Sequence, residues 1–148
     1  MREFVIDVVS NKIIVVTFLG WFVAQSIKVV TGVIRQKKFD FRWFVGTGGM
    51  PSSHVAGVAA LATAVGLNFG FDSSLFAVTV VFTIVVMFDA QGVRQATGKQ
   101  AEILNMIMED VYLKKHVEES KLKELIGHTP VQVLAGAFVG ILVAILLS

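Results

Sequence analysis

Two histidines stand at the edges of apolar segments, where ionisable side chains are uncommon. His54 lies in the stretch GGMPSSHVAG (48–57), and His128 lies in GHTPVQVLAG (127–136). One imidazole can attack phosphorus while a second protonates the leaving oxygen, and nearby cations can hold the other phosphoryl oxygens. These residue types therefore indicate phosphoryl transfer that needs no metal, if the fold brings them together.

The segment TGGMPSSH combines a glycine-rich turn with residues that favour the start of a helix. Pro51 is typical of a first helical turn, where exposed N–H groups and the helix dipole attract anions. Gly49, Ser52 and Ser53 are candidate phosphate ligands here, and His54 is the candidate proton donor. A plain capping motif with an interfacial histidine would explain the same residues, so this alternative stays open.

Four further charged residues lie in or beside apolar runs. Lys28 and Arg35 are seven residues apart, nearly two helical turns, so they project from one face toward a common anion. Snorkelling to the interface also explains either one alone. Asp89 and Arg94 point about 140° apart on a helix and are poor partners for each other. We expect a structural ion pair for Asp89 and phosphate binding for Arg94.

The elements that position these residues are predicted to cross a membrane. Hydrophobic residues make up 55% of the 148-residue chain and charged residues only 16%, unlike an ordinary soluble protein. Runs of about 20 apolar residues can span a bilayer. We expect one all-α domain over residues 1–148, an integral membrane bundle of about four transmembrane helices. Their expected ranges are 12–36, 51–69, 73–97 and 129–148.

Residues 99–126 are predicted to form an amphipathic helical insert between the third and fourth spans. Apolar residues recur at helical spacing on one side, and Asn105 belongs to the opposite, polar side. This pattern is typical of a helix that lies in the interface or caps the bundle. The apolar set is Ile103, Leu104, Ile107, Met108 and Val111.

Four spans place the two cation-rich connections on the same side of the membrane. The positive-inside rule makes that side cytoplasmic, with both termini outside, although an anion site would also gather cations there. The same side receives all the candidate residues, and this convergence carries more weight than any single residue. They are Lys28, Arg35, Ser52, Ser53, His54, Arg94 and His128.

These residues resemble the motifs of the type 2 phosphatidic acid phosphatase superfamily, which includes vanadium haloperoxidases, and more closely its divergent small bacterial and plant branch. Lys28 and Arg35 match a Lys-x6-Arg-Pro motif, with Gln36 in place of the proline. PSSH (51–54) matches Pro-Ser-Gly-His, and HTPVQVLAG (128–136) is similar to HxPxDVLAG.

The resemblance implies that His128 is a nucleophile forming a phosphohistidine, that His54 is the general acid, and that no cofactor is needed. Gln132 replaces the aspartate that orients the nucleophile. Its carbonyl can fix the imidazole tautomer but adds no charge, which implies a slower enzyme or help from Asp89. Leu122 stands where an arginine is expected, and Arg94 is the candidate replacement.

Three functions agree with these residues. We favour a lipid phosphate or diphosphate phosphatase, whose substrate tail reaches the site from the bilayer. A phosphate- or phospholipid-binding scaffold without turnover and a small oligomeric anion transporter are the alternatives. The lipid bilayer and a membrane lipid are the expected partners; homo-oligomers stay open, and no nucleic-acid partner is expected. The expected location is a bacterial cell membrane, although many bacterial relatives have sites facing outward.

Overall fold

The computed structural model describes residues 1–37, 49–112 and 128–148, and its regular elements there are all helical. Three stretches are long and apolar enough to cross a membrane, namely Lys12–Ile34, Ser74–Met108 and Pro130–Leu147, and Ser53–Phe69 is a shorter apolar helix. The prediction of an all-α membrane bundle is confirmed. The elements are α1 (Arg2–Ser10), α2 (Lys12–Gln36), α3 (Ser53–Phe69), α4 (Ser74–Phe88), the π-helical turn η2 (Asp89–Val93), α5 (Arg94–Tyr112) and α6 (Pro130–Leu147).

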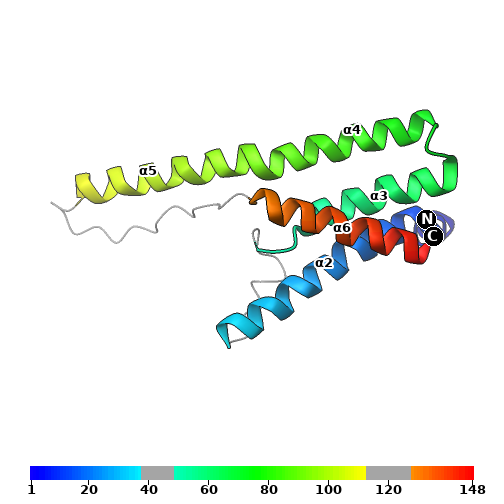
Figure 1. Ribbon diagram of the computed structural model, residues 1–148, viewed down its shortest axis with the longest axis horizontal. Helices are drawn as coiled ribbons and strands as arrows, with labels where there is room; N and C mark the ends of the chain where they lie inside the picture. The colour runs from blue at the N-terminus through cyan, green and yellow to red at the C-terminus, as the bar shows by residue number, and fades with distance from the viewer. Residues whose placement is uncertain (38–48, 113–127) are drawn as a thin grey trace.

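Helix α3 is the central element, and it packs against α2, α4 and α6 (Figure 1). Small residues make these contacts close. A Cβ added at Gly140 would overlap the carbonyl oxygen of Ala56, and one added at Gly20 would lie 2.6 Å from the Cβ of Ala60. Backbones that approach this closely gain van der Waals contact where lipid supplies no hydrophobic driving force between helices.

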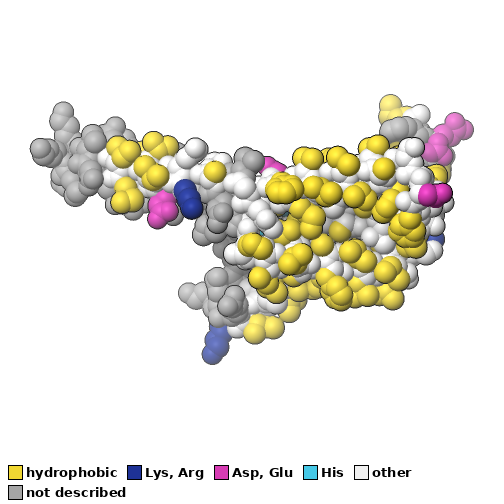
Figure 2. Space-filling model, turned by 45° about the horizontal axis from the view of Figure 1, so that its top comes forward, with side chains coloured by type: hydrophobic (Ala, Val, Ile, Leu, Met, Phe, Trp, Pro, Cys, Tyr) yellow, Lys and Arg dark blue, Asp and Glu magenta, His cyan; other side chains and the backbone are white. Residues whose placement is uncertain are grey.

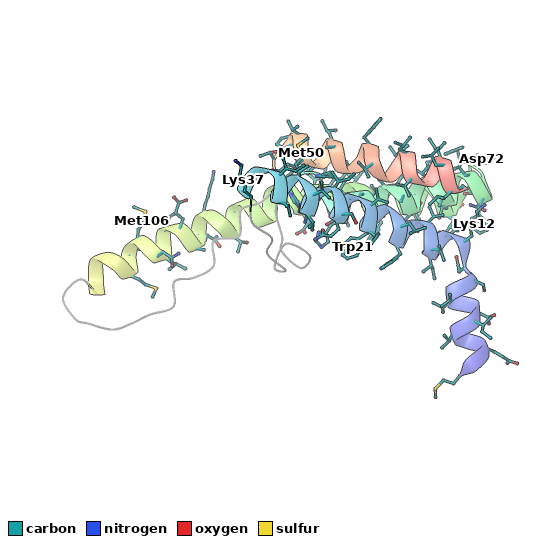
Figure 3. All side chains as sticks on the ribbon, turned by 90° about the horizontal axis from the view of Figure 1, so that it is seen from below. Lys12, Trp21, Lys37, Met50, Asp72 and Met106 are labelled. Carbon is teal, nitrogen blue, oxygen red and sulfur yellow. The ribbon has the colours of Figure 1, made fainter. Side chains whose placement is uncertain are left out.

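The direction of the helices brings the starts of α3 and α6 to one end of the bundle. There the Ser52 N–H donates to the Gln132 carbonyl oxygen at 3.1 Å. At the opposite end, Lys12 Nζ donates to the Ser148 backbone oxygen. Figure 3 shows Lys37 and Met50 at the first end and Lys12 at the second. We call the first end the His128 end.

Large apolar side chains cover the outside of the bundle (Figure 2). Phe82 and Val85 of α4 and Leu146 of α6 are among those that are exposed. The interior instead holds small residues, with Val16, Ala60, Ala64 and Ala144 in one buried cluster. This distribution is expected for a protein whose surrounding solvent is hydrocarbon rather than water.

Two expectations about element boundaries need correction, and one helix was not predicted. Helix α3 begins at Ser53 rather than Pro51, because Ser52 has extended backbone dihedrals and forms the N-cap. The third predicted helix does not end near residue 97: α4 ends at Phe88, and η2 continues it into α5, which reaches Tyr112. Helix α1 precedes Asn11, whose side chain caps α2 by accepting from two N–H groups. The sequence pattern did not predict α1.

The predicted polar side of the insert needs a correction at Asn105. Ile103, Leu104 and Ile107 are exposed, and Asn105 on the presumed polar face is buried. Helix α5 runs on from η2 beyond the bundle and does not cap it (Figure 1). The remainder of the insert, residues 113–126, lies outside the described residues.

Candidate functional site

His128 is the most firmly held of the candidate residues. Its side chain is buried, with 4% of its surface exposed, although it directly precedes α6 and its cap. Its backbone N–H donates to the Ala90 carbonyl oxygen in η2 at 3.0 Å. A π-helical turn interrupts the regular helical hydrogen bonding, and such turns are frequent at functional sites. Here the turn gives the chain before α6 a fixed point of attachment.

The side-chain amide oxygen of Gln132 faces the imidazole of His128. Its Oε1 lies 3.1 Å from Nδ1 of His128 and also accepts the Thr129 N–H at 3.1 Å. The Gln132 N–H donates back to Thr129 Oγ1, which completes a capping box. Because a backbone N–H can only donate, the amide atom that it meets is an oxygen. The neutral His128 ring therefore carries its proton on Nδ1 and its lone pair on Nε2.

Ser52 connects the start of α3 to the start of α6. Its side chain is fully buried, and the backbone of Gly136 lies against its carbonyl group. Within the part of the chain that the structure describes, its Oγ has no hydrogen-bond partner, and it does not cap α3. Buried hydroxyls are nearly always bonded, so an orphaned one calls for an explanation. An anion at this helix N-terminus would supply the acceptor.

Lys28 and Gly49 bring the first and second motifs together. Gly49 has a φ of +84°, which an L side chain rarely adopts, and a Cβ there would lie 3.1 Å from Cγ and Cδ of Lys28. The half-buried stem of Lys28 therefore crosses the glycine turn that leads into α3. This places a cation of α2 next to the N-terminus of α3.

Ser53 and His54 lie on different faces of α3. Buried Ser53 is one turn before Gly57, where an added Cβ would lie 3.4 Å from Cβ of Trp21, so it faces α2. Exposed His54 is one turn before Val58, whose carbonyl accepts from Thr83 of α4 at 3.1 Å. His54 is therefore on the side of α3 toward α4 and η2, the element that anchors His128.

The other candidates are placed by their position in the chain. Asp89 opens η2 and is half-buried, and Arg94 is the first residue of α5. Arg35 lies in the last turn of α2. The side chains of both arginines, and Leu122 as a whole, lie outside the described residues. Among residues 1–37, 49–112 and 128–148, no three His, Cys, Asp or Glu side chains are grouped to hold a metal.

Two contributors to the site were not predicted from the sequence. The spacing T-x-x-Q at 129–132 indicates a capping box and could have pointed to Thr129. No sequence signal exists for the contact of the Ala90 carbonyl with the His128 N–H, because it joins residues far apart in the chain through a π-helical turn.

The geometry can be compared with known proteins. The family described as the Divergent PAP2 family matches residues 9–143 of the chain. The chain is 44% identical over 138 residues to the uncharacterized membrane protein YuiD of Bacillus subtilis (strain 168), a match covering 84% of this chain and 86% of that protein. No solved structure matches the chain.

Proposed function

The chain belongs to the Divergent PAP2 family, and we propose that it is a membrane-embedded, metal-independent phosphatase of lipid phosphates or diphosphates. One observation carries the proposal. The Nδ1 of His128 faces an amide oxygen whose identity is fixed by the Thr129 N–H, which leaves Nε2 as the nucleophilic nitrogen. In covalent catalysis the reacting side chains are commonly oriented by a hydrogen-bond partner, the part that Gln132 Oε1 would play for His128.

In the proposed reaction, His128 Nε2 attacks phosphorus, and the bond from phosphorus to the lipid or phosphate oxygen breaks. His54 donates a proton to that leaving oxygen. Water then attacks the phosphohistidine, His54 takes its proton, and the nitrogen–phosphorus bond breaks to release inorganic phosphate. Both residues return to their starting protonation states.

The phosphoryl group would be held at the start of α3. Ser52 Oγ, which has no partner among the described residues, and the N–H groups of the first turn supply donors. Lys28 supplies positive charge from α2, and we assign Arg35 and Arg94 to the same role. Donors arranged before the reaction stabilise the charge that develops on the equatorial oxygens.

A lipid substrate agrees with the surroundings of this site. Lys28 belongs to a membrane-spanning stretch, so the phosphate site lies within reach of lipid head groups. The apolar outer surface of the bundle leaves the lipid tail in hydrocarbon throughout. The cation distribution supports a cytoplasmic location of the His128 end.

A phosphate- or phospholipid-binding scaffold is the second candidate, and the same amide contact favours it. Gln132 is neutral, so it orients the ring of His128 without stabilising the positive charge that builds on a phosphorylated imidazole. A site of this kind can bind phosphate and turn over slowly or not at all.

Phosphate release from a panel of lipid mono- and diphosphates tests the two candidates. Purified full-length protein in detergent with a metal chelator is compared with His128→Ala and His54→Ala. The phosphatase predicts release by the wild type and losses of about 10²-fold or more in both variants. Binding of orthovanadate by the wild type without any phosphate release would leave the scaffold as the function.

A further inference from the structure

Gln25 is a buried polar side chain inside the first membrane-spanning stretch. Only 3% of its surface is exposed, and it lies in α2 between Ala24 and Ser26, within a stretch apolar enough to cross a membrane. A polar group at this depth is costly unless other polar groups meet it, and such residues commonly mark functional sites in membrane proteins. The motifs above do not include it.

The helical position of Gln25 shows which way it faces. It is four residues after Trp21 and three before Lys28, so the three side chains share one face of α2. Trp21 packs against Gly57 of α3, and Lys28 crosses Gly49 just before α3. Gln25 lies between these two contacts and therefore faces α3.

Because α2 and α3 are antiparallel, the position of Gln25 along the bundle follows from the contact between Trp21 and Gly57. One turn beyond Trp21 in α2 is Gln25, and one turn before Gly57 in α3 is Ser53. Gln25 is thus level with the first turn of α3, one turn deeper in the bundle than Lys28. The buried Ser53 belongs to the same level, as does Ser52, whose hydroxyl meets no partner among the described residues.

We propose that Gln25 is a substrate-binding residue whose amide N–H donates to a phosphoryl oxygen at the membrane-facing side of the site. This inference rests on the function proposed above and adds a residue to its phosphate site. A neutral amide suits this depth because it provides directed donors without a second buried cation. Gln25 already has an interaction partner in the chain, and the two N–H donors and one acceptor of its amide allow it to keep that partner and bind phosphate.

Binding of inorganic orthovanadate and phosphate to the purified full chain tests the assignment. Affinity is obtained from the rise in melting temperature with ligand concentration. The variants are Gln25→Leu, which removes the amide, and Gln25→Glu, which keeps the size but replaces the donors with a charge that repels phosphate. Thr17→Val is the matched control, because Thr17 lies about two turns before Gln25 in α2 and its hydroxyl donates to the Ile13 carbonyl of its own helix.

Both Gln25 variants are expected to weaken vanadate binding about tenfold or more, the loss typical of one hydrogen bond to a charged group. Thr17→Val should stay within about twofold of the wild type, a change too small for a lost hydrogen bond. A Gln25→Leu variant that melts earlier but binds vanadate like the wild type would overturn the proposal and leave an interhelical bond. If Gln25→Leu does not fold, Gln25→Glu decides by the same criterion.

The vanadate-binding test of Gln25 can succeed or fail independently of the phosphatase proposal. A wild type that binds vanadate with Gln25-dependent affinity but releases no phosphate would contradict the phosphatase and support Gln25 as a ligand of phosphate. A wild type that binds neither vanadate nor phosphate would overturn the role of Gln25.

Discussion

Gln132 contacts both halves of the candidate site, since its side-chain oxygen lies 3.1 Å from Nδ1 of His128 and its backbone oxygen accepts the Ser52 N–H at 3.1 Å. The proposed nucleophile, His128, and the proposed phosphate-binding turn before α3 are thereby attached to the same turn of α6. Because Gln132 bonds both of them, the distance between His128 and the Ser52 turn is fixed by a helix. A fixed distance favours a reaction that depends on the orientation of the reacting groups.

Gln132→Leu should lower phosphate release by about 10²-fold or more, because the imidazole loses the acceptor that fixes its tautomer. The half of the capping box that runs from the Thr129 N–H to Gln132 Oε1 is lost as well, which costs about 1 kcal/mol of stability. Steady-state kinetics with thermal unfolding in detergent measure both effects. Thr129→Ser keeps the capping hydroxyl and serves as the control. Wild-type turnover in Gln132→Leu would show that the amide does not position His128.

Gln132→Glu should move the acid limb of the pH–rate profile to higher pH by roughly one unit. A carboxylate beside the imidazole favours its protonated form, so a higher pH is needed to free the nucleophilic nitrogen. Glutamate at this position also preserves the capping box, so the fold should be unchanged. Rates measured from acid to neutral pH check the shift. A shift toward lower pH would contradict the contact between residue 132 and His128.

Ser52→Ala should weaken orthovanadate binding without lowering the stability of the protein. The Ser52 hydroxyl is buried, and none of the described residues bonds to it, so its removal should leave the melting temperature unchanged or raised. Orthovanadate affinity should fall about tenfold, the loss of one hydrogen bond to a charged acceptor. Ser26→Ala, which removes a hydroxyl bonded within α2, is the control. Unchanged vanadate affinity would mean that Ser52 does not touch the phosphoryl group.

Gly140→Ala should destabilise the bundle by about 1–3 kcal/mol, because the added methyl would overlap the Ala56 carbonyl of α3. Gly92→Ala is the control, since a Cβ there meets nothing within 4 Å. Reversible unfolding in mixed micelles gives the difference in free energy. Equal stabilities of the two variants would contradict the close packing of α3 on α6.

The spans and the order of the motifs were predictable because hydropathy depends on local composition alone. Lys28 and the PSSH segment were placed at one end of the bundle from span counting, and the contact of Lys28 with Gly49 agrees with that placement. The tautomer-fixing role given to Gln132 likewise needs only the four-residue spacing from His128, which a first helical turn brings into contact.

Other features depend on long-range contacts that no local pattern contains. The apolar run through Phe88 gives no sign that η2 follows and offers the Ala90 carbonyl to His128. Gln25 was overlooked because a single neutral amide hardly lowers the hydropathy of its span, and only burial against α3 distinguishes it. The prediction that Asn105 lies on an exposed polar side was wrong, because its burial depends on tertiary contacts that helical periodicity does not contain.

Trapping of the phosphoenzyme tests the central claim most directly. Full-length protein is mixed with a radiolabelled lipid phosphate, quenched within the first turnover, and examined for a protein-bound label that is stable to alkali and labile to acid. We predict such a label in the wild type and in Ser26→Ala, and its absence from His128→Gln. A label of the same stoichiometry in His128→Gln, or phosphate release by that variant at the wild-type rate, would contradict His128 as the nucleophile.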